Sequence, residues 1–536
     1  MGMDMERKIV FMLSLFLLFF LPYLGFKSAE AKAYSGYPVH NLNTGLDYAT
    51  IQEAIDANET LNGHKIFVEA GIYYERIKIS KSIHLIGDNC NSIIDAENVT
   101  NCDCIYIDVG SVTIENFTLR NAARYGILVT TLRGLYFYPI SSVKIFGNII
   151  ENNMIGGVLM DGQATIDVVP VVNMSIDSNI IRSNGAGVVL DCAENTTVIN
   201  NVIEYNTDCG VHVLGQAVNN WRSTGLPVLI KDNVIRFNEG SGICTEMGGS
   251  SFNPNPVRII KNIIENNKEA GVTIASGYGQ IVEKNCIRNN TKGIYFSVKN
   301  TSAGRESKIT ANTLINNSFG VYFYWGAWVY DLEATFTRNN FINNNQHVFS
   351  DKINSTWEYN GEGNYWSNYT GYDLDHDGIG ESPHTIDAYN IDHYPLVGMF
   401  STFDSVYGYE INFISNSSIF DVTFNLIEPS QASLNFKVTG ADDTFGFCRI
   451  CIPKVLINGS YIIKFDGEDI THQVFEPPCS NDEFKCFYIN YTHSSHDIEI
   501  SGTSVITEFS SVFIMPLFIV ATLVAVILYR RKHTLT

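Results

Sequence analysis

The chain has little positive charge for its length. Its 536 residues include 35 lysines and arginines against 56 aspartates and glutamates, which gives a formal net charge of −21 and an isoelectric point near 4.9. A nucleic-acid-binding protein needs a basic face that displaces counterions from phosphates, so this composition argues against that function. Charged residues make up only 17% of the chain and hydrophobic residues 45%, a balance typical of a folded protein with a sizeable core.

Apolar runs near both ends of the chain have the features of membrane signals. Residues Ile9–Phe26 follow a short charged stretch and precede small residues, which predicts a secretory signal peptide over 1–33, with an uncleaved anchor helix as the alternative. Residues 508–529 are almost wholly apolar and are followed by a basic cluster in 530–536. This order predicts one transmembrane helix with a cytoplasmic C-terminal tail, which places the body of the protein on the extracellular face of the cell membrane.

Glycosylation signals and cysteines agree with that location. About thirteen N-x-[ST] sequons occur, and these are glycan acceptors only outside the cytosol; they include Asn98, Asn173, Asn195, Asn300, Asn354 and Asn458. Such a compartment also permits disulfides among the 11 cysteines. Four of them cluster near the C-terminus and are expected to form two bridges, with a metal or redox site at Cys448-x-x-Cys451 as the alternative: Cys448, Cys451, Cys479 and Cys486.

The body of the chain lacks a helical apolar stripe and instead repeats one phrase from Val112 to Ser350. Each copy alternates apolar residues, then has Asn, a short apolar run, a second Asn, a turn, Gly and another alternation, as in VKIFGNIIENNMIGGVLM at 143–160. The copies are spaced by roughly 22 to 32 residues. Period-two alternation with Asn and Gly turns predicts coils of short parallel strands, and the L-x-x-L-x-L spacing of leucine-rich repeats is not found. The first Asn of each copy is Asn116, Asn148, Asn179, Asn201, Asn233, Asn262, Asn285, Asn312 and Asn340.

Physical reasons account for the recurring turn residues. Asn tolerates the left-handed turn conformation, and stacked Asn amides hydrogen-bond from coil to coil as a ladder. Gly permits a second tight bend before the next strand. Before the repeats, Thr50-Ile51-Gln52-Glu53 forms a capping box, which predicts a short helix to about Asn58 that covers the first open coil.

Two segments carry a family resemblance. YATIQEAIDAN at 48–58, followed by IFVEAGIYYERIKI and SIHLIGD, resembles the opening of pectate-lyase-like and carbohydrate-binding/sugar-hydrolysis (CASH) β-helices. NYWSNY at 364–369, followed by GYDLDHDGIGESPHTIDAYNIDHYPLV, resembles the closing signature of NosD-type periplasmic copper-binding proteins. With the repeats, the resemblance covers about 36–398. It implies a right-handed parallel β-helix, a fold that hosts many chemistries.

The pattern changes after the repeats. Residues 400–503 lose the Gly/Asn periodicity and show longer alternating strands, which predicts a small β-sandwich stalk. The fold class expected is therefore all-β: a right-handed parallel β-helix over 34–399 with an N-terminal helical cap, a sandwich over 400–503 and one C-terminal transmembrane helix. This arrangement resembles archaeal surface proteins, whereas a NosD-type copper protein is expected to be periplasmic and unanchored.

An Asp-rich segment predicts a cation site. Asp373, Asp375 and Asp377 alternate before Gly378, as in the first half of an EF-hand-like loop, but the twelfth position is His384 rather than Glu. We expect calcium here as a structural ion, with Asp387 or Asp392 completing the coordination and an ion-free turn as the alternative. The predicted ligand set is Asp373, Asp375, Asp377, Ile379, Glu381 and Asp387.

A second candidate site follows from aligning the strands after each repeat Gly. Positions one and three are apolar and point inward, so positions two and four point outward. Position four holds Asp161 and Asp191 in adjacent coils and Glu246 two coils further on, with His212 at position two between them. Stacked carboxylates about 5 Å apart raise one pKa, which suits acid/base or nucleophilic work on a glycosidic bond. The predicted catalytic set is Asp161, Asp191, His212 and Glu246.

Aromatic residues in the loops after these strands predict a sugar-binding groove. The substrate-binding candidates are Trp221, Arg222, Tyr278, Trp325 and Trp328. The arginine of pectate-lyase-like enzymes and the paired-Asp and Gly-His-Gly motifs of polygalacturonase-like enzymes are not found. We therefore expect a membrane-anchored surface glycoprotein that binds extracellular polysaccharide or surface glycan. The alternatives are a polysaccharide lyase or glycoside hydrolase, a structural or adhesion envelope protein, and a NosD-like copper-binding protein, for which His384 and His393 are the one noteworthy histidine pair.

Overall fold

A computed structural model describes residues 36–133, 136–162, 170–216, 226–248, 256–276, 279–298, 306–325, 331–427 and 431–503. The predicted signal peptide over 1–33, the predicted membrane helix over 508–529 and the tail over 530–536 lie outside these ranges. Within the ranges, no helix is both long and apolar enough to cross a membrane.

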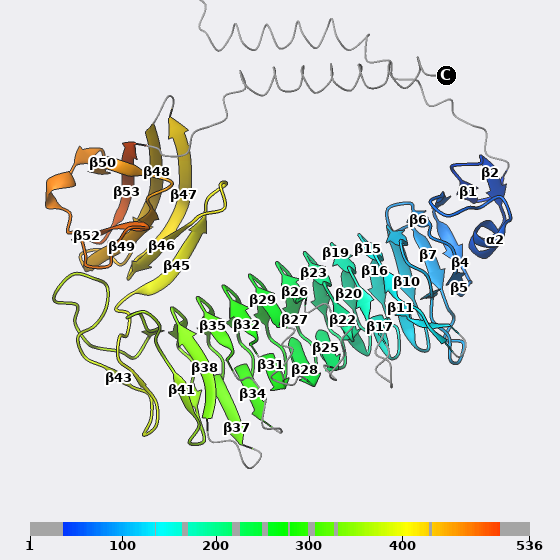
Figure 1. The fold of residues 1–536 in the computed structure, drawn as a ribbon, viewed down its shortest axis with the longest axis horizontal. Helices are drawn as coiled ribbons and strands as arrows, with labels where there is room; N and C mark the ends of the chain where they lie inside the picture. Colours follow the sequence, from blue (N-terminus) through cyan, green and yellow to red (C-terminus); the bar gives the residue numbers. More distant parts are fainter. Residues whose placement is uncertain are drawn as a thin grey trace, which may run out of the picture.

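Three long sheets wind around one core, and Figure 1 shows their coils stacked along a rod. Sheet A has the order β2 (Leu46–Tyr48), β1 (Val39–Asn41), β3 (Lys65–Val68), β6 (His84–Gly87), β9 (Thr113–Glu115), β15 (Lys144–Phe146), β19 (Ser175–Asp177), β23 (Thr197–Ile199), β26 (Val228–Lys231), β29 (Val257–Ile260), β32 (Ile281–Glu283), β35 (Lys308–Thr310), β38 (Asp331–Thr337) and β41 (Asn354–Thr356). Sheet B has the order β4 (Gly71–Tyr73), β7 (Ser92–Asp95), β10 (Phe117–Arg120), β16 (Ile149–Glu151), β20 (Ile180–Arg182), β24 (Val202–Glu204), β27 (Val234–Arg236), β30 (Ile263–Glu265), β33 (Cys286–Arg288), β36 (Thr313–Ile315), β39 (Asn340–Ile342) and β42 (Tyr365–Trp366). Sheet C has the order β40 (Gln346–Phe349), β37 (Phe319–Trp325), β34 (Lys292–Val298), β31 (Ala270–Ser276), β28 (Ile243–Gly248), β25 (Val211–Gln216), β21 (Ala186–Asp191), β17 (Gly156–Asp161), β11 (Tyr125–Thr130), β8 (Ile105–Ile107) and β5 (Ile77–Ile79).

Each repeat contributes one strand to each sheet, and equivalent strands of successive repeats pair in parallel. In one coil these are β15, β16 and β17, which pair with β19, β20 and β21 of the next. This topology is a parallel β-helix, consistent with the right-handed β-helix expected from the repeat. Two antiparallel strands, β1 and β2, precede the first parallel pair, β3 with β6.

A short helix and several small strands supplement the coils. Helix α2 (Ile51–Asp56) begins at Thr50 with the expected capping box, and Ile51, Ala54 and Ile55 belong to the same apolar core as the first coils. The small strands are β12 (Leu132–Arg133), β13 (Tyr136–Phe137), β14 (Ile140–Ser141), β18 (Val171–Val172), β22 (Ala193–Glu194), β43 (His384–Thr385) and β44 (Ile391–Asp392).

Two ladders of buried asparagines follow the corners of the coils. Asn179, for example, donates its backbone N–H to the side-chain oxygen of Asn201 at 2.9 Å, and its side-chain amide donates to the carbonyl of Ile145 in the preceding coil. One ladder lies between sheets A and B and contains Asn148, Asn179, Asn201, Asn233, Asn262, Asn285, Asn312, Asn339 and Asn364. The other lies between sheets B and C and contains Asn153, Asn184, Asn206, Asn238, Asn267, Asn290, Asn317 and Asn344. Because these side chains are buried, the ladders satisfy backbone groups that would otherwise be unpaired.

The residues before the ladder asparagines, not the asparagines themselves, adopt the left-handed conformation. The sequence-based explanation that Asn recurs because it tolerates this conformation is therefore wrong for the ladder positions. Ser178 before Asn179 and Ser183 before Asn184 have positive φ, whereas the ladder residues themselves do not. The predicted first rung, Asn116, is itself a left-handed residue with φ 63°. The predicted last rung, Asn340, is also wrong, since its side chain pairs with the backbone of Phe400 and the rung is Asn339.

The glycine before each sheet C strand is required by space rather than by a bend. At Gly157 an added Cβ would lie 2.6 Å from Ile181, 2.7 Å from the carbonyl of Gly187 and 3.2 Å from the amide of Asn184. The tight bend expected at these glycines does not use a left-handed backbone, because their φ values are not positive. Because these glycines have no Cβ, they leave space for the side-chain amides of the second Asn ladder.

The residues that fill the interior of the β-helix change from aliphatic to aromatic along its length. Aliphatic residues fill the early coils, and stacked rings fill the last ones, with Phe336 against Trp357 at 4.4 Å and Phe341 against Trp366 at 4.2 Å between centroids. The first Asn ladder ends here on Asp392, whose carboxylate accepts from the backbone N–H of Asn364 at 2.8 Å and from the indole of Trp366 at 2.9 Å. Burial raises the pKa of Asp392 to about 6.

Two antiparallel sheets follow the last coil and share an apolar core, and we call them the two-sheet domain. One sheet contains β45 (Met399–Asp404), β46 (Glu410–Ser415), β49 (Phe445–Pro453) and β52 (Phe484–Thr492). The other contains β47 (Ser418–Ile427), β48 (Gln431–Thr439), β53 (Ser495–Thr503), β50 (Asn458–Phe465) and β51 (Glu468–Asp469), and η1 (Thr471–Gln473) is a short 3-10 helix between β51 and β52. The domain lies at the C-terminal end of the rod in Figure 1.

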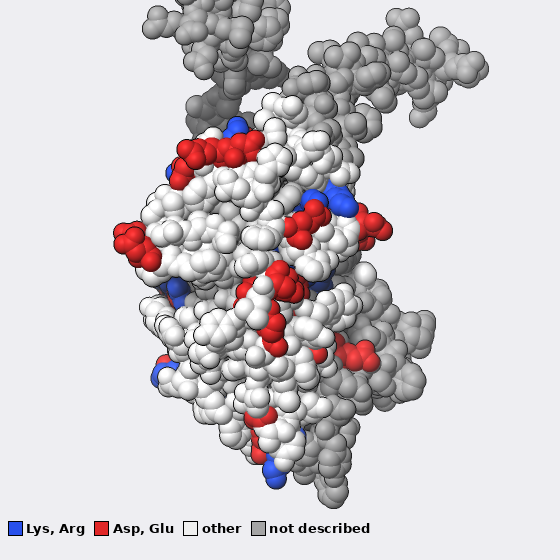
Figure 2. All heavy atoms as spheres, turned by 90° about the vertical axis from the view of Figure 1, so that its left-hand side faces the viewer, with Lys and Arg blue, Asp and Glu red and all other residues white. Residues whose placement is uncertain are grey.

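Buried charge joins the two-sheet domain to the β-helix. Arg449 on β49 is almost fully buried and forms an ion pair with Glu362, which also pairs with Arg338. Lys261 and Lys284 of the β-helix both pair with Asp404. On the face shown in Figure 2, which views the molecule from the end that carries the two-sheet domain, Asp and Glu form small separate groups on a mostly uncharged surface.

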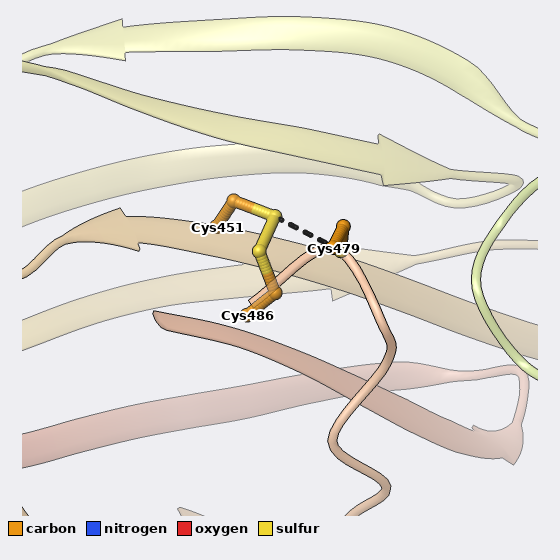
Figure 3. Close-up of side chains that lie close together, drawn as sticks. All are labelled: Cys451, Cys479 and Cys486. Carbon is orange, nitrogen blue, oxygen red and sulfur yellow. Dashed lines mark hydrogen bonds between the residues drawn. A yellow bond between two sulfur atoms is a disulfide. The ribbon is translucent and has the colours of Figure 1, made fainter. Parts of the chain in front are cut away.

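The cysteines of the two-sheet domain form one disulfide in place of the two expected. Cys451 and Cys486 are cross-strand partners on β49 and β52 and are bonded to each other. Cys448 is a free thiol within the apolar core; it is three residues before Cys451 on β49, so the two side chains point to opposite faces of the sheet. The Cys479 sulfur lies 3.8 Å from that of Cys451, as Figure 3 shows.

Candidate functional site

The loops that follow the strands of sheet C differ in length from coil to coil. Loops of 4 to 13 residues follow its strands before the next sheet A strand, in the run from β11 to β38. The neighbouring corners carry the uniform Asn ladders instead. The expectation that insertions enter directly after the Gly-started strands matches this topology.

The predicted register of the outward row holds over five coils. Position four pairs in the order Thr130, Asp161, Asp191, Leu214 and Glu246. A β-bulge between Thr245 and Glu246 then shifts the register, so Glu246 is opposite Ser276 rather than the Ala275 expected from the alignment. A bulge adds a residue without changing the repeat, which is why the alignment missed it.

Asp161 and Asp191 are direct neighbours on β17 and β21. Thr130 donates its hydroxyl to Asp161 at 2.9 Å, and the Cys192 thiol donates to Asp191 at 3.4 Å. Both carboxylates are half-buried. Burial raises the pKa of Asp191 above its usual range, the Cys192 hydrogen bond and the His212 charge oppose this, and the charge of Asp161 reinforces it. A carboxyl group with a raised pKa therefore lies beside a second carboxylate, an arrangement that acid/base chemistry can use.

His212 and Glu246 lie one and two coils beyond Asp191. The Nε2 atom of His212 is 3.6 Å from a carboxylate oxygen of Glu246. The imidazole side chain is 20% exposed and the Glu246 side chain 48%. The four residues predicted as catalytic thus share one outer face, as two neighbouring pairs.

A row at position two runs beside these carboxylates. It pairs Val189, His212, Cys244 and Thr273 across successive coils and continues into Tyr295, Tyr322 and Phe349. Tyr322 stacks on Phe349 at 4.7 Å, and Tyr324 on the same strand is 48% exposed. The face therefore passes from carboxylates at one end to aromatic rings at the other.

The predicted loop aromatics are mostly outside the described residues. Trp221, Arg222, Tyr278 and Trp328 all lie there. Trp325 ends β37, three coils beyond Glu246, where its backbone pairs with Val298.

Sequence reasoning missed two members of this face. Cys244 is buried directly opposite His212, and Thr130 holds Asp161. The same alignment contains both positions. Cys244 was missed because only carboxylates and histidines were considered as candidates at the outward positions.

The Asp-rich loop brings three of its predicted ligands together. Asp373, Asp375 and Asp377 each offer an oxygen, and these atoms lie within 4.8 Å of one another. Asp373 accepts from the backbone N–H groups of Asp377 and Gly378. Burial raises the pKa of Asp377 to about 6, and the charges of Asp375 and Asp373 add to the shift.

The remaining predicted ligands have other partners. Glu381 accepts from the backbone of Leu374 at 2.6 Å. The N–H of Ile379 donates to Asp377, and its carbonyl oxygen, the atom that would bind a cation, takes no part in this hydrogen bond. Asp387 closes a turn with Asn390. Asp392, named as an alternative to Asp387, ends the Asn ladder instead.

The two-sheet domain contacts the Asp-rich loop. Arg449 donates to the backbone carbonyl of Asp377 at 2.9 Å, and His376 packs on Phe475 and Tyr488 at 4.6 and 5.2 Å. The loop is therefore part of the junction between the two regions.

The histidine pair considered for copper is split. His384 stacks on Trp366 at 4.9 Å, and burial lowers its pKa. His393 pairs instead with Glu358 at 3.1 Å. Within the described residues, the clusters able to hold a metal are the Asp-rich loop, the three C-terminal cysteines and a group containing His212.

Comparison with known proteins identifies a family match within the β-helix. The profile of the family described as periplasmic copper-binding protein (NosD) matches residues 218–371. The resemblance to NosD-type β-helices noted from the sequence is thus confirmed for this stretch.

One curated relative and several solved structures are similar to the chain. A cell surface glycoprotein of Methanothermus fervidus is 34% identical over 119 residues, which is 22% of this chain and 18% of the relative. The chain thus matches less than a fifth of that relative's length. The A-module of mannuronan C-5 epimerase AlgE6 from Azotobacter vinelandii is 15% identical, with a TM-score of 0.35, over 57% of this chain and 85% of its own. Pectate lyase Pel9A is 14% identical, with a TM-score of 0.37, over 59% of this chain and 75% of its own.

Proposed function

We propose that the protein is a membrane-anchored cell-surface glycoprotein whose β-helix binds extracellular polysaccharide along the outer face of sheet C. The observation that carries the proposal is the in-register row of Thr130, Asp161 and Asp191, with Glu246 two coils further on and His212 in the row beside it. Carboxylates accept hydrogen bonds from sugar hydroxyls, and aromatic rings stack on sugar faces. Successive coils repeat every ~4.8 Å, close to the length of a sugar unit, so one chain can contact several coils.

Surface display is supported by the sequence and by one relative. The predicted signal peptide and C-terminal membrane helix direct the body of the protein outward, and the relative from Methanothermus fervidus is described as a cell surface glycoprotein. Among the predicted sequons, Asn98, Asn173, Asn195, Asn354 and Asn458 are exposed, as glycan attachment requires.

Calcium is proposed as a structural ion in the Asp-rich loop. Three convergent carboxylate oxygens suit a hard cation, and backbone carbonyls and water would complete its six to eight ligands. An ion there would stabilise the junction, since Arg449 and His376 already attach the loop to the two-sheet domain. Helix α2, at the other end, is proposed to cover the first coil.

The test is a polysaccharide-binding screen of the full-length protein, with calcium and with a chelator. Neutral and acidic polysaccharides are both included, because carboxylates bind neutral sugars directly and acidic sugars only through a bridging cation. We expect at least one polysaccharide to bind, and Asp161→Asn with Asp191→Asn to weaken binding at least about tenfold. Glu283→Gln, on the outer face of sheet A, is the matched control. A screen in which nothing binds under either condition contradicts the proposal.

A second candidate is a polysaccharide lyase or glycoside hydrolase that uses the same carboxylates. The raised pKa of Asp191, on the strand next to that of Asp161, favours it, because a carboxyl group with a raised pKa is suited to donate a proton. Retaining glycosidases hold their two carboxyl groups about 5 Å apart, near the spacing of paired strands. Asp191→Asn should abolish any cleavage of a bound polysaccharide, and unchanged cleavage excludes this assignment.

A further inference from the structure

Three metal-ligating side chains converge on two neighbouring strands of sheet C. His212 and Cys244 are direct partners on β25 and β28, and Glu246 is two residues after Cys244, on the same outward face. One ligand atom from each lies within 4.8 Å of the others. The cluster begins one coil beyond Asp191.

The Nε2 atom of His212 is a buried polar atom without a hydrogen-bond partner among the described residues. The nearest oxygen of Glu246 is 3.6 Å away, too far for a hydrogen bond. Buried polar atoms in native proteins are nearly always paired with protein, water or an ion. An ion held between these three side chains would satisfy that nitrogen.

The ligand set selects the class of metal. One imidazole nitrogen, one thiolate and one carboxylate are the three ligand types that zinc accepts at 2.0–2.3 Å, with a fourth position left for water. Calcium and magnesium prefer oxygen ligands alone, and copper(I) prefers sulfur ligands to a carboxylate. We propose that His212, Cys244 and Glu246 bind one zinc ion with an open coordination position facing the outer surface of sheet C.

The surroundings of Cys244 also define the main rival. The side chain of Cys209 hydrogen-bonds to Cys244, and both are free thiols in the structure. Zinc would displace the proton of Cys244, because a coordinating thiol is deprotonated. A disulfide between Cys209 and Cys244 would instead remove the thiolate from the site.

The experiment measures zinc and cobalt binding to the full-length protein. Without reductant, the Cys451–Cys486 disulfide stays closed and the C-terminal cysteine cluster does not compete. We expect one equivalent of Zn²⁺ to bind, and Co²⁺ to give a thiolate charge-transfer band and the strong visible absorption of tetrahedral cobalt. His212→Ala and Cys244→Ser should each lower zinc affinity at least about 100-fold, since even outer-shell changes at metal sites cost 10- to 100-fold.

Control variants separate this site from the rest of the chain. Cys286→Ser, on β33 of sheet B, should leave the cobalt spectrum unchanged. Asp351→Asn, at an exposed carboxylate outside both proposed metal sites, should also leave it unchanged. Zinc binding that survives Cys244→Ser, a cobalt spectrum without the thiolate band, or thiol mapping that finds Cys209 bonded to Cys244 would each overturn the proposal. Polysaccharide binding is measured in a separate experiment, so a protein that does not bind zinc could still bind polysaccharide as proposed.

Discussion

Two surfaces of the same β-helix differ in how they use repetition. The corners between sheets place the same residue in every coil, buried and hydrogen-bonded, from Asn148 to Asn364 in one ladder and from Asn153 to Asn344 in the other. The outer face of sheet C varies from coil to coil at the same register, as the outer face of sheet A also does, but sheet C brings the carboxylates Asp161 and Asp191 together in adjacent coils. Repetition therefore marks what holds the fold, and the adjacent carboxylates on a varied face mark where function is expected.

The largest effect on stability should come from breaking a ladder in its middle. Asn233 accepts two hydrogen bonds from Asn201, and its amide donates to the carbonyls of Val198 and Lys231. Asn233→Ala leaves these buried groups unpaired, so we expect a loss of about 4 kcal/mol in the free energy of unfolding. Urea unfolding followed by circular dichroism measures it. The exposed Asn91→Ala is the control, and equal losses in both variants would mean that the ladder adds nothing special.

A second prediction concerns the space beside the ladder. Gly187→Ala forces a Cβ against Ile203, the Asn206 amide and the Gly210 carbonyl, and should cost about 3 kcal/mol. At Gly71, an added Cβ would only touch the ring of Tyr73 at ordinary distance, so Gly71→Ala should be nearly neutral. Thermal unfolding of the two variants compares them directly. A tolerated Gly187→Ala would show that the coils shift apart easily.

The end of the ladder predicts a pH dependence. The folded pKa of Asp392 is raised to about 6, so between pH 4 and 6 the folded state keeps a proton that the unfolded state releases. The contribution of Asp392 to the free energy of unfolding should therefore fall by about 2 kcal/mol as the pH rises through this window.

Asp392→Asn removes the contribution of Asp392 and leaves that of Asp377, whose pKa is also raised to about 6. The neutral amide oxygen of the variant can still accept a hydrogen bond from the backbone of Asn364. Urea midpoints from pH 4 to 7 measure the difference, with the exposed Asp351→Asn as control. The same pH slope in both variants would assign the effect to another group.

The smallest effect is expected on the outer row. Asp161 and Asp191 are half-buried and repel each other, so Asp161→Asn or Asp191→Asn should change the free energy of unfolding by less than about 0.5 kcal/mol. Equilibrium unfolding of both variants tests it. A loss as large as that of Asn233→Ala would make these carboxylates structural, and the contrast between the two surfaces would fail.

The repeat made the β-helix and the outward row predictable, because a fixed period fixes the register. Asp161 opposite Asp191 followed from counting residues after each glycine. The bulge at Thr245 and Glu246 did not, since a local irregularity leaves no trace in the repeat. The hydrogen bond that ends the first ladder at Asp392 could not be predicted either. The same holds for the ion pair between Arg449 and Glu362, because both contacts join segments far apart in the sequence.

Carboxyl footprinting of the full-length protein, with and without the bound polysaccharide, is the most direct test of the central claim. Carbodiimide labelling read by mass spectrometry reports each exposed carboxylate separately. The account predicts that a bound polysaccharide protects Asp161, Asp191 and Glu246 while Glu283 on sheet A stays labelled. Protection of Glu283 or of the two-sheet domain, with the sheet C carboxylates unchanged, would contradict it.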